Sequence, residues 1–416
     1  MGCQQKKLTL LSQYFYPEMI STGHILTELI VELSKQGVKT SVICAQPTYY
    51  SNDKVDREIT YKNTVIKRTN NTNFDKNSFK GKLFNSLSFF IGALWLEIKE
   101  KSRYPILVVT NPPFLGLAGL ILNKIKSRQY MLIIHDLYPD VAINMRFIRC
   151  NSLIALVWNK INLKIYQSAS SIIVLGRDVQ KRIREKLAPE QHEKVKFIPN
   201  WADPELICPI DQNCNPFIDE LGLNGRFLVQ YSGNMGITHD METIIEAAQI
   251  LRENEDIHFV LIGGGGKLSK IKKMVESYEL TNVSFLPYQP RKFLKHSLCS
   301  SHVSLISLEK GAEGLSVPSK LYGIMASGRP IIAIMPENTE VALTLKEFKC
   351  GIVTPPKDVL SLVKSIIWMK NNESDRKMMG LRAHKAFLTN FTVQYCAKQY
   401  YHLIEQMFSE EQLSEK

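Results

Sequence analysis

The sequence predicts an α/β protein made of two doubly wound units, and three observations support this fold class. The chain has 416 residues, a length that suits two domains at about 100–200 residues each. Hydrophobic residues make up 44% and charged residues 22%, as in an ordinary folded protein. Short runs of leucine or β-branched residues alternate with amphipathic helical windows, which is typical of parallel sheets covered by helices.

The first half of the chain contains one well-marked helix between predicted strands. The helix is expected at 25–35, where apolar residues recur at helical spacing and Gly37 follows as a stop signal. Strands are expected at 8–12, 40–44, 106–109, 130–134, 171–174 and 195–198.

The alternation pauses between Asn200 and Asn224 and then resumes, which predicts a domain boundary near residue 200. Strands are expected at 227–232, 258–262, 283–285, 303–307 and 330–334, and helices at 240–254, 267–278, 319–326 and 359–370. We therefore expect an N-terminal Rossmann-like domain over residues 1–200 and a C-terminal Rossmann-like domain over 201–382. A terminal helix with a polar tail, residues 383–416, is expected to pack back toward the N-terminal domain.

The charge of the chain is lopsided. Up to Asn200 there are 29 basic and 15 acidic residues, a net charge of +14, whereas the remainder carries −2. Such a field suits nucleic acid, an anionic membrane face or a phosphorylated substrate, although it also favours solubility alone. The eight cysteines form no C-x-x-C pairs and the N-terminus lacks the apolar stretch of a secretion signal, so a reduced, cytoplasmic protein without structural zinc is expected.

One apolar segment is too short to cross a membrane. Residues 83–96 are uncharged for 14 residues, whereas a spanning helix needs roughly 18 or more. Lys76, Lys80 and Lys82 precede the segment. It is either an interfacial segment at an anionic membrane or a core helix of the first domain.

Two turns in the first half carry residues suited to chemistry. Thr22 and Gly23 stand where a helix begins, and a glycine there lets backbone N–H groups approach an anion or simply serves the turn. His135 and Asp136 follow a predicted strand, where the imidazole can donate to a substrate hydroxyl and the carboxylate can orient it or accept a proton. A second carboxylate, Asp140, follows four residues later, and a structural role for one of the two carboxylates is equally open. A metal site is a weaker interpretation, because neighbours such as His135 and Asp136 on a strand point to opposite faces.

Two glycine-containing loops follow strands in the second half. Gly233, Asn234 and Gly236 form a pliable turn that suits an anion but lacks the spacing of a dinucleotide-binding fingerprint. The second loop runs from Gly263 to Lys267. It is not a nucleoside triphosphate phosphate loop, because Leu261 and Leu268 stand where that pattern needs Gly and Ser or Thr.

The segment from Glu313 to Pro330 is the most informative. Ser316 is expected to cap a helix whose first N–H groups, from Ser319 and Lys320, meet a diphosphate together with the Lys320 ammonium. Glu313 can accept hydrogen bonds from sugar hydroxyls. The alternative is an ordinary capped helix with a surface lysine.

In this order, the motifs resemble the retaining GT-B glycosyltransferases of family 4, especially the exopolysaccharide and colanic-acid-type branch. The resemblance rests on QYFYPEMISTGHILTELIVELSKQGVKTSVICAQPTYY, VVTNPPF, HDLYPD, FIPNWAD, YSGNMGITHDMETIIEAA and GLSVPSKLYGIMASGRPIIA. It implies two doubly wound domains that face a cleft. The implied reaction moves a sugar from a nucleotide-diphosphate-sugar to an acceptor, with retained configuration and without a metal or other cofactor.

The resemblance also implies roles for individual residues. His135 and Asp136 would line the acceptor side beside the reacting carbon, and Glu313 would lie near the donor sugar. The donor would be bound by Thr22, Gly23, Gly233, Asn234, Gly236, Lys267, Tyr288, Leu315, Ser316, Ser319 and Lys320. The sequence departs from the family where a second glutamate usually contacts the ribose, because Leu321 and Gly323 occupy the candidate positions, and it lacks the usual Arg and Lys pair in YSGNMGITHD.

We therefore expect a cytoplasmic hexosyl- or related glycosyltransferase, peripheral at the inner face of the cell membrane, that acts in exopolysaccharide, lipopolysaccharide or capsule assembly. Its expected partners are a nucleotide sugar donor, a lipid-linked or glycan acceptor and an anionic membrane surface, with no nucleic acid. The alternatives are a nucleotide-sugar epimerase on the same scaffold and a non-catalytic polyanion- or membrane-binding protein.

Overall fold

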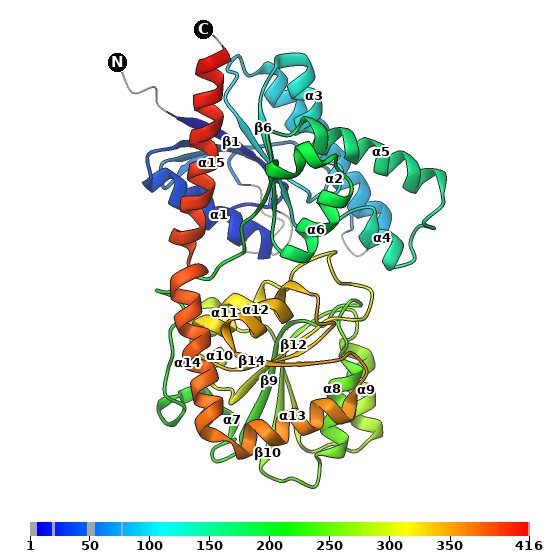
Figure 1. Ribbon diagram of the computed structural model, residues 1–416, viewed down its shortest axis with the longest axis vertical. Helices are drawn as coiled ribbons and strands as arrows, with labels where there is room; N and C mark the ends of the chain where they lie inside the picture. Colours follow the sequence, from blue (N-terminus) through cyan, green and yellow to red (C-terminus); the bar gives the residue numbers. More distant parts are fainter. Residues whose placement is uncertain (1–5, 19–20, 48–54, 76–77, 415–416) are drawn as a thin grey trace. The chain divides into compact units, whose positions relative to one another are not determined.

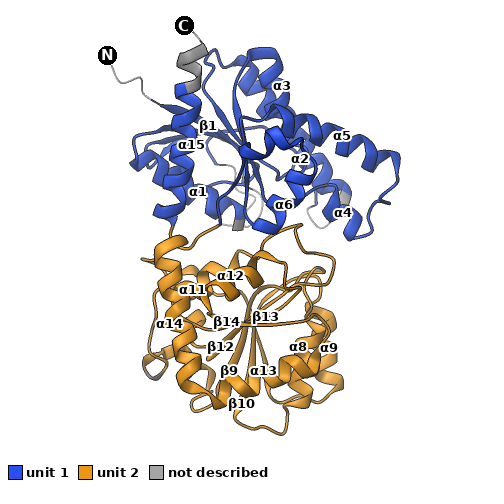
Figure 2. Ribbon diagram, viewed as in Figure 1, with its two compact units in different colours: residues 1–199, 393–416 blue, residues 200–392 orange. Residues whose placement is uncertain are grey.

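The computed structural model describes residues 6–18, 21–47, 55–75 and 78–414. The chain forms two compact units, of which unit 1 contains residues 1–199 and 393–416 and unit 2 contains residues 200–392 (Figure 2). Each unit is a sheet with helices packed on it (Figure 1). The predicted α/β class with two doubly wound units is therefore confirmed.

Unit 1 has an eight-stranded sheet in the order β3-β4-β2-β1-β5-β6-β7-β8. The strands are β1 (Lys7–Leu11), β2 (Lys39–Cys44), β3 (Glu58–Tyr61), β4 (Thr64–Arg68), β5 (Ile106–Val109), β6 (Tyr130–Ile134), β7 (Ser171–Val174) and β8 (Val195–Phe197). The helices are α1 (Ser21–Lys35), α2 (Phe79–Lys99), α3 (Gly116–Lys126), α4 (Asp140–Asn144), α5 (Leu153–Ser168), α6 (Arg177–Glu185) and α15 (Val393–Ser414). Among the strands in the described part of unit 1, only β3 pairs antiparallel, with β4, so the sheet has the parallel character that the alternating pattern predicts.

The six strands predicted in unit 1 are all present, but the β3–β4 hairpin was not predicted from the sequence. Its turn places Lys62 and Asn63 at φ 44° and 64°. Two-residue hairpin turns of this type need positive φ at both positions and usually carry Asn-Gly or Asp-Gly. The pair Lys62-Asn63 lacks the glycine that marks such a turn. The turn residues of the sequence therefore do not predict this hairpin.

Unit 2 has a six-stranded parallel sheet in the order β11-β10-β9-β12-β13-β14. The strands are β9 (Phe227–Asn234), β10 (Ile257–Gly264), β11 (Val283–Leu286), β12 (Val303–Ser307), β13 (Ile331–Ile334) and β14 (Gly351–Thr354). The helices are α7 (Pro216–Leu221), α8 (Glu242–Ile250), α9 (Leu268–Ser277), α10 (Leu294–Cys299), α11 (Lys320–Ala326), α12 (Glu340–Phe348), α13 (Val359–Asn371) and α14 (Glu373–Asn390). All five predicted strands are present, whereas the edge strand β14 and the helices α7, α10 and α12 were not predicted.

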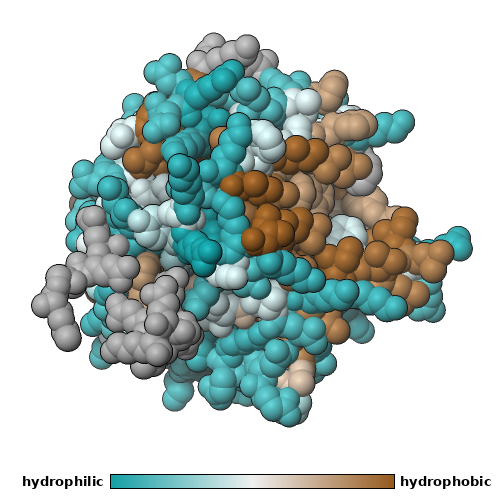
Figure 3. Space-filling view, turned by 90° about the horizontal axis from the view of Figure 1, so that it is seen from above, coloured by the Kyte–Doolittle hydropathy of each residue, from teal (hydrophilic) through white to brown (hydrophobic). Residues whose placement is uncertain are grey.

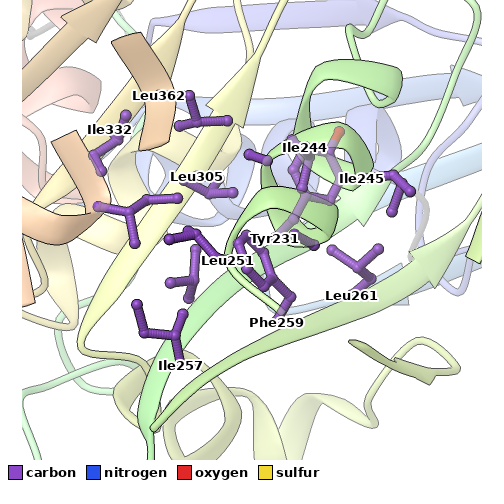
Figure 4. Close-up of a cluster of buried hydrophobic side chains, with 14 of the residues drawn as sticks. Tyr231, Ile244, Ile245, Leu251, Ile257, Phe259, Leu261, Leu305, Ile332 and Leu362 are labelled. Atoms are coloured by element: carbon purple, nitrogen blue, oxygen red, sulfur yellow. The ribbon is translucent and has the colours of Figure 1, made fainter. Parts of the chain in front are cut away.

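The core of unit 2 fixes the end of β9. Tyr231 lies among fully buried aliphatic side chains that include Ile244, Leu261 and Leu305 (Figure 4). Burial of each such side chain contributes about 1.5–3 kcal/mol to folding. The Tyr231 hydroxyl donates a 2.7 Å hydrogen bond to the backbone oxygen of Asn234, so the core reaches the loop that follows the strand.

The C-terminal part of the chain differs from the single expected segment of residues 383–416. Residues 383–390 continue α14, which packs on α11 in unit 2. The helix ends at Asn390, and the backbone oxygen of the next residue, Phe391, accepts a hydrogen bond from the Ala202 N–H. Residues 393–414 form α15, which packs on α1 in unit 1 and places the Tyr401 hydroxyl 2.7 Å from the Lys6 Nζ.

No helix in the described ranges is both long enough and apolar enough to cross a membrane. The apolar segment of residues 83–96 is the middle of α2. Lys76, which was expected to precede it, lies outside the described residues.

Candidate active site

The ends of β9 and β10 form a backbone cradle in unit 2. The two strands pair through Gly233 with Gly263 and Asn234 with Gly264. Gly263 has φ +127°, and a Cβ there would lie 2.2 Å from the Gly233 oxygen. Only glycine fits this position, because both the conformation and the close approach exclude a side chain. The sequence marks these glycines, but their pairing across two strands is visible only in the structure.

The loops after these strands interlock through backbone hydrogen bonds. The Met235 N–H donates to the Gly264 oxygen at 2.7 Å, and the Lys267 N–H donates to the Met235 oxygen at 2.9 Å. A Cβ on Gly265 would lie 2.5 Å from the Asn234 Oδ1. The two glycine loops therefore form one joined structure, which contains the predicted residues Gly233, Asn234 and Gly236.

Lys320 brings a positive charge to this cradle. It is the first residue of α11, and its Nζ lies 3.6 Å from the centroid of the Tyr231 ring. A Cβ placed on Gly233 would lie 3.1 Å from both the Cε and the Nζ of Lys320. Within the described part of the chain, the Nζ is buried and has no hydrogen-bond partner. Burial lowers the pKa of Lys320 from 10.5 to about 7.

A buried ammonium without a partner carries an uncompensated desolvation cost. An anion placed at the Gly233 loop would compensate for that cost, because it supplies both an opposite charge and hydrogen-bond acceptors. The combination of a glycine cradle and an unpartnered lysine therefore makes this strand end a candidate phosphate site.

Lys267 differs from the sequence-based expectation of a free phosphate partner. Its Nζ donates to Glu242 and to Glu309, each at 2.7 Å, and to the backbone oxygen of His239 at 2.7 Å. Burial alone would lower its pKa, but the hydrogen bonds to the two carboxylates outweigh burial and the pKa is raised. The side chain of Lys267 therefore already has two anionic partners, which the spacing along the chain does not reveal.

The same two glutamates belong to a possible metal-binding group. Asp240, Glu242 and Glu309 offer oxygens within 4.8 Å of one another. However, Lys267 is bonded to two of these carboxylates, and Asp240 accepts hydrogen bonds from Thr243 and from the Lys357 N–H. The group is therefore internally satisfied by protein donors.

The segment before α11 is only partly as expected. The helix begins at Lys320 with Ser319 as its N-cap residue, so Ser316 does not occupy the capping position that the sequence suggested. The Glu313 side chain accepts a 2.6 Å hydrogen bond from the Gly311 N–H. Leu315 is buried and Ser316 is half-buried.

Tyr288 lies over the end of β10. Its hydroxyl donates to the Gly264 oxygen at 3.3 Å, and its ring lies 3.2 Å from a Cβ built on Gly263. The side chain is nevertheless 59% exposed. An exposed aromatic ring beside the glycine cradle is a suitable surface for a nucleoside base to stack on.

Tyr231 and His239 were missed as candidate site residues. Tyr231 contacts Lys320 through its ring, as described above. His239 lies close to Gly236, and burial, followed by the charge of Lys320, lowers its pKa to about 3. Both residues lie in the motif YSGNMGITHD. A tyrosine in a strand cannot be told from an ordinary core residue until its neighbours are known.

In unit 1, His135 and Asp136 follow β6. The backbone N–H of His135 donates to the Thr110 hydroxyl at 3.1 Å, and that hydroxyl donates to the Asp136 backbone oxygen at 3.3 Å. Burial lowers the pKa of His135 to about 4 and raises the pKa of Asp136 to about 6. Burial therefore favours the neutral form of both side chains.

Asp136 borders a cavity of about 10 Å³ that Tyr138, Asn162 and Tyr166 also line. This volume is about that of one water molecule, so the cavity within unit 1 is too small for a sugar. A carboxyl group with a pKa of about 6 can exchange a proton near neutral pH, which suits acid–base chemistry.

Thr22 and Gly23 lie in the first turn of α1. A Cβ on Gly23 would lie 2.5 Å from the backbone oxygen of Glu18, so the packing of the preceding loop requires glycine here. Thr22 is half-buried. This packing explains the glycine without a ligand, and donor contact by these two residues stays a prediction.

Two doubly wound α/β units of this kind, each with a largely parallel sheet, define the GT-B architecture of glycosyltransferases. Sucrose-phosphate synthase from Thermosynechococcus elongatus has a TM-score of 0.79 and 16% identity, covering 97% of this chain and all of that chain. HepE of Anabaena in complex with UDP has a TM-score of 0.72 and 13% identity, covering 96% of this chain and all of that chain. At these identities the likeness establishes the fold.

The chain is a glycosyltransferase, because two glycosyltransferase family models match it, one in each half. The family described as Glycosyltransferase Family 4 matches residues 23–206, and the family described as Glycosyl transferases group 1 matches residues 217–386. The probable glycosyltransferase WbjE of Pseudomonas aeruginosa is 28% identical over 277 residues, which are 67% of this chain and 68% of that protein. The putative colanic acid biosynthesis glycosyl transferase WcaI of Escherichia coli K12 is 24% identical over 367 residues, which are 85% of this chain and 89% of that protein. The resemblance found in the sequence is thereby confirmed.

Proposed function

We propose that this glycosyltransferase moves a hexose or related sugar from a nucleotide-diphosphate-sugar to a lipid-linked or polysaccharide acceptor. The proposed pathway is cell-surface polysaccharide assembly, such as exopolysaccharide, lipopolysaccharide or capsule. The observation that carries the donor assignment is the buried, unpartnered Nζ of Lys320 beside Gly233. HepE, which shares the fold, was solved with UDP and with UDP-glucose, and the name of WcaI refers to colanic acid biosynthesis.

In the proposed reaction, the leaving diphosphate lies in the cradle formed by Gly233, Asn234 and Gly236. Negative charge grows on the diphosphate as the bond to the sugar breaks. The Lys320 ammonium and the backbone N–H groups of the cradle stabilise that charge, and a fixed donor in a buried site does so more effectively than water. Lys320 takes the role that a divalent cation has in other phosphate sites, and we therefore propose that no metal or other cofactor is required. Lys267, by contrast, positions the second glycine loop.

The remaining roles follow the family resemblance. Glu313 is proposed to accept hydrogen bonds from the donor sugar, and Tyr288 is proposed to stack on the base. His135 and Asp136 are proposed to contact the acceptor near the reacting carbon. The sugar is proposed to keep its anomeric configuration through displacement on one face.

The proposed location is the cytoplasmic side of the cell membrane, where the protein is peripheral. The support is the +14 charge of residues 1–200 and the apolar surface of α2. The proposed partners are therefore the donor, the acceptor and an anionic membrane surface, and they do not include nucleic acid.

The testing experiment is turnover of the purified protein with bacterial membrane lipids against UDP-, GDP- and dTDP-sugars. Release of the nucleoside diphosphate and radiolabel in the lipid fraction are both followed. We expect label in the lipid from one donor, unchanged by EDTA and lost in Lys320→Met. Conversion of the nucleotide sugar without an acceptor would instead indicate an epimerase, and absence of turnover together with salt-sensitive polyanion binding would indicate a non-catalytic protein.

A further inference from the structure

Helix α2 in unit 1 has its polar and apolar sides reversed. The side facing the interior repeats every four residues and consists of Gly81, Asn85, Phe89, Ala93 and Glu97. Two of these five are polar, and Glu97 forms a buried ion pair with Arg128. The outward side instead carries large apolar residues that are 38–59% exposed, namely Leu83, Phe84, Leu87, Ile91, Trp95 and Ile98.

Helix α5 also exposes large apolar side chains. Leu153 and Ile154 are 80% and 62% exposed, and Leu156 and Val157 are more than half exposed. Its buried side includes Asn162, whose amide donates a 2.6 Å hydrogen bond to the Tyr138 backbone oxygen. A helix of a water-soluble domain normally turns its apolar side inward, so two helices in one unit that expose this many large apolar side chains indicate a surface suited to an apolar environment.

The two helices contribute to one continuous region. Helix α3 packs against both α2 and α5, and its own Ile125 is 57% exposed. In Figure 3, apolar side chains gather on the right-hand side, the side on which Figure 1 draws α2 and α5. We call the exposed apolar residues of α2 and α5 named above the α2–α5 face.

The charge around this face is mostly positive, although Asp75 lies exposed just before α2. Residues 101–135 and 141–177 contain no Asp or Glu. The two acids near the end of α2, Glu97 and Glu100, are buried and half-buried respectively. Exposed cations belong to the same helices and to the segments beside them, namely Lys80, Lys82, Lys99, Arg149, Lys160 and Lys164. Lys99 lies with its Nζ 4.5 Å from the Trp95 ring, so a cation and an interfacial aromatic residue are adjacent.

We propose that the α2–α5 face docks this protein on an anionic lipid bilayer. The apolar side chains enter the boundary between headgroups and acyl chains, and the surrounding lysines and arginines contact lipid phosphates. The positive border favours a bilayer over a second copy of the chain, because two such faces would bring like charges together. This inference deepens the proposed membrane location, because it assigns the surface of the protein that contacts the membrane. It rests on the proposed function only in that a lipid-linked acceptor would lie in the same membrane.

The test is co-sedimentation of the full chain with vesicles of equal parts phosphatidylcholine and phosphatidylglycerol. We expect binding that falls by about tenfold or more in Ile91→Gln/Trp95→Gln and in Leu153→Gln/Ile154→Gln, because each change removes apolar surface from the interface. Lys80→Gln/Lys82→Gln should weaken binding by roughly fivefold for each lysine, and added salt or pure phosphatidylcholine should weaken it as well.

The matched control is Leu360→Gln/Leu381→Gln in unit 2, where the two leucines are 62% and 63% exposed. We expect this variant to sediment with vesicles as the wild type does. Equal loss in the control, or no vesicle binding by the wild type, overturns the proposal. Self-association of the wild type that the α2 and α5 variants abolish, without vesicle binding, overturns it in favour of a second copy.

Binding of nucleoside diphosphates, measured in the same preparations, separates this inference from the proposed function. Vesicle binding without any nucleotide binding would leave the docking surface standing and remove the donor assignment. Nucleotide binding without vesicle binding would do the reverse.

Discussion

The two lysines that lie beside the glycine loops of unit 2 have opposite electrostatic surroundings. Lys267 is bonded to Glu242 and Glu309, and its pKa is raised. Lys320 lies against the Tyr231 ring without a carboxylate partner, and burial lowers its pKa to about 7. Both lysines stand at the carboxyl ends of parallel strands, the usual ligand-binding edge of such sheets.

The difference shows why a lysine beside a glycine loop is not by itself a phosphate site. A phosphate that approached Lys267 would have to compete with two carboxylates that already neutralise the ammonium. At Lys320 the same phosphate would meet an ammonium whose desolvation cost is not compensated by any protein group in the described residues. Binding of the phosphate would compensate for that cost and is therefore favoured. We therefore expect Lys267 to be a structural lysine and Lys320 to bind the ligand.

The largest effect is expected from Lys320→Met. Loss of one charged donor to a developing anion costs about 10²–10³-fold in turnover, which corresponds to roughly 3–4 kcal/mol. Steady-state kinetics with the preferred donor measures this loss. Lys267→Met should keep donor affinity within about threefold, because its charge is already taken by glutamates. Equal losses of donor affinity in the two variants would remove the distinction between the lysines.

Lys267→Met is instead expected to lower the free energy of unfolding. Removing the ammonium leaves Glu242 and Glu309 facing each other, and the partly exposed site limits the cost to about 1–3 kcal/mol. The pKa of Glu242, lowered to about 2 with burial opposing the hydrogen bonds from Lys267 and Lys270, should rise in the variant. Urea denaturation of the variant, with Lys267→Met/Glu309→Gln as a partial rescue, measures the effect. An unchanged midpoint in the single variant would contradict the structural role.

Donor binding should take up a proton at Lys320. At pH 8 this side chain is mostly neutral in the free protein because its pKa is about 7, and a bound diphosphate should hold it protonated. Uptake should approach one proton near pH 8 and vanish well below pH 7, while affinity falls by up to about tenfold per pH unit above 7. Calorimetry in buffers of different ionisation enthalpy measures this uptake, and Lys320→Met should lose it. Proton uptake that persists in that variant would assign the proton to another group.

The same pKa sets the sign of a stability effect in the ligand-free protein. Between pH 7 and 10.5 the unfolded chain binds more protons at Lys320 than the folded chain does, because the folded pKa is the lower one. The contribution of this residue to the free energy of unfolding therefore rises with pH across that window. Thermal unfolding of the wild type and of Lys320→Met, compared at pH 6.5 and pH 9, measures this contribution of Lys320. The stability gained by the variant should be greater at pH 6.5.

The smallest effect is expected at Tyr231. Tyr231→Phe removes the hydrogen bond to the Asn234 oxygen but keeps the ring under Lys320, and should weaken donor binding by about fivefold or less, or roughly 1 kcal/mol. Tyr231→Leu also removes the ring and should weaken donor binding further. Donor titrations of the two variants, with unfolding curves as a control for the buried position, check the order. Identical affinities would show that the ring does not position Lys320.

The fold was largely predictable because the strands are continuous apolar runs between turn signals. Ile106–Val109 and Tyr130–Ile134 match their predicted bounds. The elements that were missed lack such signals. The β3–β4 hairpin turns at Lys62-Asn63 without a glycine, and the edge strand β14 is the short half-exposed segment Gly351–Thr354.

The candidate site was predictable in its position along the chain but not in its contacts. Gly233, Asn234, Gly236 and Lys320 could be singled out because glycines and a lysine stood beside predicted elements. The pairing of Lys267 with Glu309 spans 42 positions, and the contact of Lys320 with Tyr231 joins a helix to a strand far away in the sequence. Such contacts depend on strand order, which the periodicity of one sequence does not specify. The sequence likewise did not decide whether α2 is a core helix or an interfacial helix. The burial of its side chains was needed to show which residues face outward.

The most direct test of the central claim compares nucleoside diphosphate with nucleoside monophosphate binding by calorimetry at pH 6.5, in the wild type, Lys320→Met and Lys267→Met. The claim is that Lys320 provides the cation for the diphosphate. It predicts that the wild type and Lys267→Met favour the diphosphate by about a hundredfold and that Lys320→Met loses most of this preference. A preference that survives in Lys320→Met and disappears in Lys267→Met would contradict the claim.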